Sequence, residues 1–118
     1  MNKPRLHHVP CLDTQGLHRT AYWEWGDPSN PRVLVCVHGL TRQGRDFDVL
    51  AAAMSDHYRV VCPDIAGRGE SDRLTNPMEY GIPRYVADMV TVLARVHAET
   101  LRWVGTSMGG LMGVGLAA

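Results

Sequence analysis

Residues 33–37, with the sequence VLVCV, form an unbroken apolar run in a chain of 118 residues. A strand that is hydrophobic at every position is buried on both faces, as in a parallel sheet covered by helices. Two further segments of strand character follow at 58–62 (YRVVC) and 101–104 (LRWV). The three segments predict the central strands of one sheet.

Segments with helical periodicity separate these strands. Residues 45–54 and 83–98 predict helices, and the chain also looks helical from Met108 onward. The apolar faces expected for the first two are Phe47, Leu50, Ala51, Met54 and Tyr85, Met89, Val92, Leu93, Val96. A strand at 19–25, expected to be antiparallel and near a sheet edge, precedes the series. The alternation predicts an α/β fold, mostly parallel, with helices on both faces of the sheet.

Composition and charge indicate which binding partners and which cellular location to expect. The formal net charge is zero, with 12 basic and 12 acidic residues and no run of like charge, so nucleic acid and membrane are not expected partners. The three widely spaced cysteines, without a signal peptide, predict reduced thiols and a cytoplasmic location. Residues 1–18 are not assigned, and a basic tail is the simpler interpretation of His7 and His8. No metal-ligand spacing is visible, and no cofactor is expected.

The segment Gly105-Thr106-Ser107-Met108-Gly109-Gly110 joins the last predicted strand to the last predicted helix. A strand, a sharp turn and a helix around G-x-S-x-G describe a nucleophile elbow. Side chains two positions either side of the serine would collide, so glycine is required there. The alternative, a glycine-rich loop without chemistry, is disfavoured by the flanking strand and helix.

Two other motifs end the neighbouring strands. His38-Gly39-Leu40 follows the first buried run, and the Leu40 amide is a candidate oxyanion donor. A structural imidazole bonded to nearby backbone is favoured for His38 over direct proton transfer. Residues 63–72 (PDIAGRGESD) lack the spacing of a phosphate loop, so a turn held by Asp64, Arg68 and Ser71 is expected.

These motifs, in this order, resemble the α/β-hydrolase family over about 19–118, specifically its esterase and lactonase branch. The resemblance implies that residues 1–118 are the N-terminal portion of such a domain. It further implies that Ser107 is the nucleophile and that the amides of Leu40 and Met108 hold the oxyanion. A small ester-like substrate would react through an acyl-enzyme. The supporting residues are His38, Gly39, Gly105, Gly109, Gly110 and Asp64.

The sequence after Ser107, MGGLMGVGLAA, contains neither an acid nor a histidine. A serine hydrolase needs both, and this family places them after the serine. We therefore expect a C-terminal half of the same hydrolase, as a further segment or a second chain, to supply them. The alternatives are a non-catalytic interaction fragment or, within the fold, a carbon–carbon bond hydrolase or a cofactor-free haloperoxidase.

Overall fold

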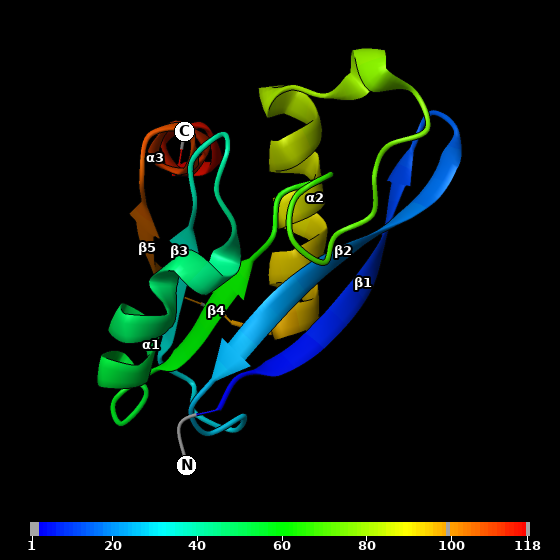
Figure 1. Cartoon of the computed structure of the whole chain (residues 1–118). Coiled ribbons are helices and arrows are strands. Elements are labelled where there is room, and N and C mark those ends of the chain that lie inside the picture. Colours follow the sequence, from blue (N-terminus) through cyan, green and yellow to red (C-terminus); the bar gives the residue numbers. More distant parts are fainter. Residues whose placement is uncertain (1–2, 99, 118) are drawn as a thin grey trace.

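A computed structural model of the chain describes residues 3–98 and 100–117, with a five-stranded sheet of order β1-β2-β4-β3-β5 (Figure 1). The strands are β1 Arg5–Asp13, β2 Gly16–Trp25, β3 Val33–Val37, β4 Arg59–Pro63 and β5 Leu101–Gly105. Strand β3 is parallel to both β4 and β5, whereas β2 is antiparallel to β1 and β4. The α/β class and the parallel centre predicted from the sequence are confirmed.

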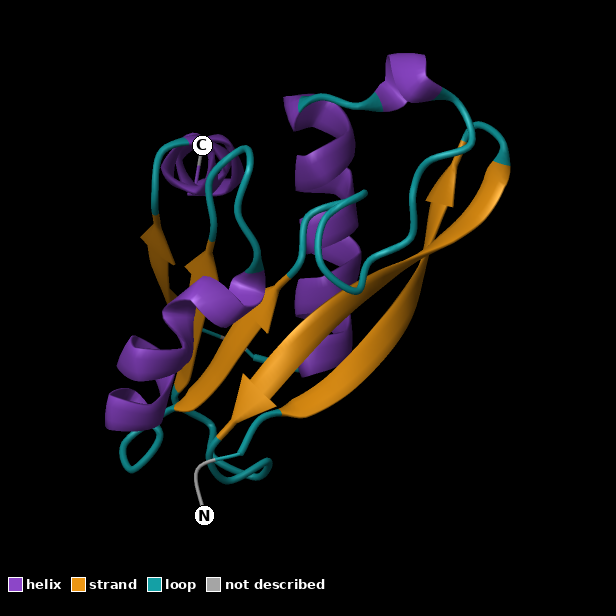
Figure 2. Ribbon diagram, viewed as in Figure 1, coloured by secondary structure: helices purple, strands orange, loops and turns teal. Residues whose placement is uncertain are grey.

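Helices cover both faces of this sheet (Figure 2). They are α1 Asp48–Met54, preceded by a 3₁₀ turn at Gly44–Phe47, α2 Ile82–Val96 and α3 Met108–Ala117. Helices α2 and α3 pack on one face, and α1 packs on the other. Within the described residues, no helix combines the length and the apolar character that crossing a bilayer requires.

Strand β3 contributes buried side chains to both hydrophobic clusters of the core. Its odd-numbered side chains, Val33, Val35 and Val37, join the cluster beneath α2 and α3, whereas Leu34 and Cys36 join the cluster beneath α1. All five are at most 5% exposed. Each fully buried aliphatic side chain is worth about 1.5–3 kcal/mol, so this short strand gains stability from both of its faces. The two-sided burial is why the run contains no polar residue.

The N-terminal segment is not a basic tail; that expectation was wrong. Strand β1 pairs with β2 along its whole length, and Val9 and Cys11 are buried against the rest of the fold. The two strands meet in a tight hairpin where Gly16 adopts φ +127°, a backbone conformation that favours glycine. The strand expected at 19–25 is therefore longer and lies second from the edge.

Helix α1 also differs from its predicted face. Phe47 and Ala51 are buried as expected, but Leu50 is 38% exposed. The segment begins with a 3₁₀ turn, which has three residues per turn, and only continues as an α-helix from Asp48. A prediction that assumes one continuous helix with about 3.6 residues per turn therefore assigns Leu50 to the buried face, although its side chain is partly exposed.

Candidate active site

Ser107 lies at an abrupt turn between β5 and α3. Its backbone has φ +54°, the left-handed region, which costs a residue other than glycine about 1–2 kcal/mol. The side chain is exposed, and no described residue forms a hydrogen bond with its hydroxyl. The strained turn thus presents a free hydroxyl at the carboxyl edge of the parallel strands.

Glycines make this turn sterically feasible. A Cβ on Gly105 would lie 2.4 Å from the carbonyl carbon of Gly109, and a Cβ on Gly109 would lie 2.1 Å from the Val37 oxygen. Both separations are well inside van der Waals contact. Gly110 is different, because its nearest contact would be 3.4 Å, to the Gly105 oxygen. Gly105 and Gly109 are thus required, because β5, the turn and the start of α3 pack closely against one another and against the end of β3. Gly110 is not sterically required.

The loop after β3 runs beside the serine. A Cβ on Gly39 would lie 3.5 Å from the Ser107 Cβ, so Gly39 and Ser107 are close neighbours. The Thr106 amide donates to the Val37 oxygen over 3.0 Å, which ties the two loops together. Among the described residues, nothing accepts a hydrogen bond from the amide of Leu40 or of Met108. Both amides are therefore free, and that of Met108 lies at the N-terminus of α3, where the helix dipole favours negative charge.

His38 fixes the peptide that carries the Leu40 amide. It is 1% exposed; its Nε2 accepts a hydrogen bond from the Ile65 amide over 2.9 Å, and its Nδ1 lies 2.7 Å from the Gly39 oxygen. Nδ1 therefore carries the proton and donates it to that carbonyl. Burial, the largest cause, lowers the pKa of His38. Because carbonyl and amide point in opposite directions in a trans peptide, anchoring the Gly39 oxygen turns the Leu40 N–H away from His38.

Asp64 organises the loop that follows β4. Its fully buried carboxylate accepts hydrogen bonds from the amides of Gly44 at 2.7 Å and Glu70 at 2.8 Å. The Ser71 hydroxyl donates to the Asp64 carbonyl oxygen over 2.6 Å. Gly69, with φ +53°, passes so close that a Cβ there would lie 2.3 Å from a carboxylate oxygen. The carboxylate of Asp64 is thus occupied with loop backbone.

Arg68 makes contacts beyond its own turn that the sequence did not indicate. Its Nε donates to the Leu40 carbonyl oxygen over 3.0 Å, and its Nη1 donates to the Ala66 carbonyl oxygen and to the Tyr85 hydroxyl. The guanidinium also lies 5.1 Å from the centre of the Tyr85 ring. Arg68 therefore links the loop after β3 to helix α2. Arg68 and Tyr85 share no sequence motif, so only the packing of α2 brings them together.

Among the described residues, no histidine or carboxylate is hydrogen-bonded to Ser107. His18 bonds to Asp13 and Asp88, His7 bonds to Glu24, and His38 is held by backbone. Strand β3 lies between β4 and β5, so Asp64, which follows β4, is a further strand away from the serine. The arrangement contains a free hydroxyl and two peptide donors but, within the described part of the chain, no proton acceptor for the serine.

A profile of the family described as the alpha/beta hydrolase fold matches residues 32–118. Among curated relatives, a 3-hydroxybutyrate-oligomer hydrolase of Cupriavidus necator is 62% identical over 114 residues, which cover 97% of this chain and 39% of the relative. The chain therefore spans about two fifths of the length of this relative.

Solved structures give the same picture. An alpha/beta hydrolase of Novosphingobium aromaticivorans superposes with a TM-score of 0.87 at 37% identity, covering 99% of this chain and 40% of that one. A thioesterase domain from the curacin biosynthetic pathway superposes with a TM-score of 0.87 at 28% identity, covering 98% of this chain and 42% of that one. By profile, sequence and structure, the chain belongs to the α/β-hydrolase fold family and is related to hydrolases.

Proposed function

We propose that this chain carries the nucleophile of a serine hydrolase that cleaves ester-like carbonyl compounds through an acyl-enzyme. The observation that carries the proposal is the strained, exposed Ser107 between β5 and α3. In the first step, the serine oxygen bonds to the carbonyl carbon and the alcohol leaves with a proton. In the second step, water attacks the acyl-enzyme, releases the acid and restores the serine.

The amides of Leu40 and Met108 are proposed to stabilise the oxyanion. Both lack an acceptor among the described residues, and the Gly39 loop lies against Ser107. Fixed peptide donors at such a site need no reorganisation as charge develops, and losing one typically costs about 10²–10³ in kcat. His38 and Arg68 act as positioning residues, because they hold the carbonyl oxygens of Gly39 and Leu40.

The acid and the histidine are proposed to come from a C-terminal half of the hydrolase. Strand β5 has a hydrogen-bonded neighbour only on its β3 side within the described sheet. An apolar hollow lies beside it, lined by Leu93, Leu101, Trp103, Gly113 and Leu116. An edge strand exposes unpaired N–H and C=O groups with which a further strand can pair. The same half would also supply the remaining walls of the substrate pocket.

The relative from Cupriavidus necator is a 3-hydroxybutyrate-oligomer hydrolase, and its name suggests oligomers of 3-hydroxybutyrate as the substrate class. We propose that the serine of this chain attacks the ester bonds of such oligomers. The free, buried cysteines Cys11, Cys36 and Cys62 support a cytoplasmic location for the reaction.

A chimera tests the proposal. Residues 1–118 replace the equivalent segment of the Cupriavidus necator hydrolase, and hydrolysis of 3-hydroxybutyrate oligomers is measured. We expect activity in the chimera, covalent labelling of Ser107 by a reactive phosphonate, and loss of both in Ser107→Ala. A folded Ser107→Ala chimera that keeps its activity and its labelling would exclude Ser107 as the nucleophile.

The unpaired edge of β5, with Val104 37% exposed, also favours a second candidate, a non-catalytic interaction fragment. That protein would associate through β5 and α3, and Ser107→Ala would not change its association. A carbon–carbon bond hydrolase or a haloperoxidase would use the same serine, so assays of the chimera on the corresponding substrates separate them from an esterase.

A further inference from the structure

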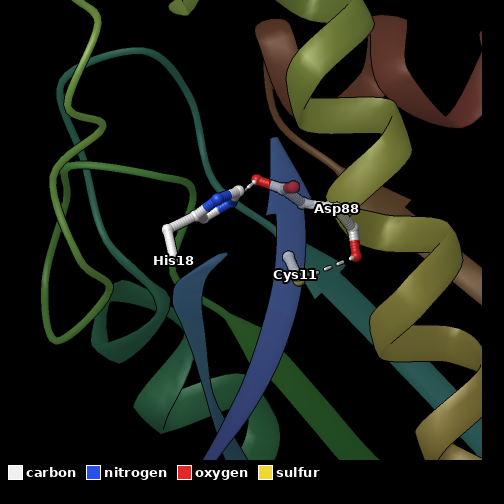
Figure 3. Close-up of side chains that lie close together, drawn as sticks. All are labelled: Cys11, His18 and Asp88. Carbon is white, nitrogen blue, oxygen red and sulfur yellow. Dashed lines mark hydrogen bonds and ion pairs between the residues drawn. The ribbon is translucent and has the colours of Figure 1, made fainter. Parts of the chain in front are cut away.

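A buried cluster joins the N-terminal hairpin to helix α2 (Figure 3). Cys11 of β1 and His18 of β2 are cross-strand partners, and Asp88 of α2 faces them. The three residues are 1%, 4% and 2% exposed. The His18 Nε2 lies 2.8 Å from an Asp88 carboxylate oxygen. In the sheet, β4 and β3 separate this cluster from β5, so the proposed acyl transfer does not use it.

The cluster offers the donor atoms of a zinc site. The Cys11 sulfur, an imidazole nitrogen of His18 and a carboxylate oxygen of Asp88 all lie within 4.8 Å of one another. Zinc binds thiolate, imidazole and carboxylate at about 2.0–2.3 Å, which places the sulfur and the nitrogen about 3.6 Å apart in a tetrahedron. A movement of about 1 Å therefore brings the donors into range.

Asp13 supplies the outer contact that zinc-binding histidines usually have. Its carboxylate lies 2.6 Å from the His18 Nδ1 and is therefore placed to accept that proton. Such a bond fixes the ring orientation and leaves Nε2 as the metal-binding nitrogen. Without a metal, Nε2 instead forms the 2.8 Å hydrogen bond with the Asp88 carboxylate.

An independent observation also points to a cation at this place. The second carboxylate oxygen of Asp88, Oδ1, is buried and has no hydrogen-bond partner among the described residues. A buried carboxylate oxygen without a partner is costly. A cation bound by the Asp88 carboxylate would give Oδ1 the partner that it lacks.

The charges balance with and without the ion. The carboxylates of Asp13 and Asp88 face the doubly hydrogen-bonded His18 ring, and the guanidinium of Arg84 donates nearby to the Leu12 carbonyl oxygen. Zinc would replace two protons, the one on the Cys11 thiol and the one in the His18–Asp88 hydrogen bond, so the net charge of the cluster is unchanged. We propose that Cys11, His18 and Asp88 bind a structural zinc ion that fastens the β1–β2 hairpin to α2.

Cobalt and zinc titrations of the full 118-residue chain, prepared metal-free, test the site. We expect one Co²⁺ per chain, a thiolate-to-cobalt charge-transfer band, displacement of cobalt by zinc, and a higher Tm with zinc. Cys11→Ser should abolish the band, and Cys62→Ser is the matched buried control that should retain it. Asp13→Asn keeps all three ligands and should weaken zinc binding about 10–100-fold.

Circular dichroism establishes that each variant is folded, and the metal content of the purified chain gives a second measurement. Substoichiometric cobalt binding by the folded chain would overturn the proposal, as would a band that persists in Cys11→Ser. Zinc affinity unchanged in both Cys11→Ser and Asp13→Asn would also overturn it and leave only a hydrogen-bonded cluster.

Discussion

The Gly105 α-carbon faces the Gly109 peptide so closely that a Cβ on Gly105 would lie 2.4 Å from the Gly109 carbonyl carbon. Backbone lies on both sides of this contact, so no side-chain rotation relieves it. The turn that exposes Ser107 therefore depends on a glycine two residues before the serine.

Gly105→Ala should destabilise the fold by about 3 kcal/mol, the upper part of the range for overpacking. Gly110→Ala is the matched control, because its Cβ would lie 3.4 Å from the nearest atom and alanine favours a helix by about 1 kcal/mol. Chemical denaturation of both variants measures the difference. Equal free energies of unfolding would show that the close contact does not constrain the turn.

Ser107→Gly should be more stable than Ser107→Ala by about 1 kcal/mol, because glycine adopts φ +54° without the steric cost that alanine incurs. Both variants lack the hydroxyl, so the comparison isolates the backbone strain. Thermal and denaturant unfolding provide the measurement. A Ser107→Ala variant at least as stable as Ser107→Gly would contradict a strained backbone at this position.

Lowering the pH should selectively weaken the fold through His38. Burial lowers the pKa of His38, so below about pH 6.5 the unfolded chain binds a proton that the folded chain resists. Stability from this group is complete above about pH 6.5 and is lost as the pH falls towards the folded pKa. The stability advantage of the wild type over His38→Gln should therefore shrink between about pH 7 and pH 5. An advantage that is constant across this range would refute a buried, neutral imidazole.

Arg68→Met should reduce kcat about 10-fold in the chimera and change KM little, because the Leu40 loop loses one fixed contact. Loss of a whole oxyanion donor typically lowers kcat by about 10²–10³, so a smaller effect is expected for a residue that only positions the donor. Arg45→Met is the matched control; Arg45 pairs with Asp48 and lies over the Trp23 ring. Steady-state kinetics of both variants give kcat and KM for the comparison. A loss confined to KM, or an equal loss in Arg45→Met, would count against a positioning role.

Much of the fold could be predicted because its signals are local. The run 33–37 predicted a strand buried on both faces, and the apolar stripe of 83–98 predicted α2, whose buried residues include Tyr85, Met89 and Val92. Strand β1 was missed because polar residues occupy many of its positions and obscure the alternation. The Leu50 face was misassigned because the preceding 3₁₀ turn changes the period.

The amino-acid sequence alone predicted the α/β class, the parallel centre of the sheet and the glycine-flanked position of Ser107, because the pattern that indicates each of them lies within short segments of the chain. Only the tertiary structure decided which distant groups meet: Arg68 with Leu40 and Tyr85, and His18 with Asp88, which is 70 residues away. The reason is physical. Local sequence sets backbone conformation and the direction of burial. Contacts between elements are fixed by how helices and strands pack against one another, and the spacing of two residues in the chain does not show whether they meet.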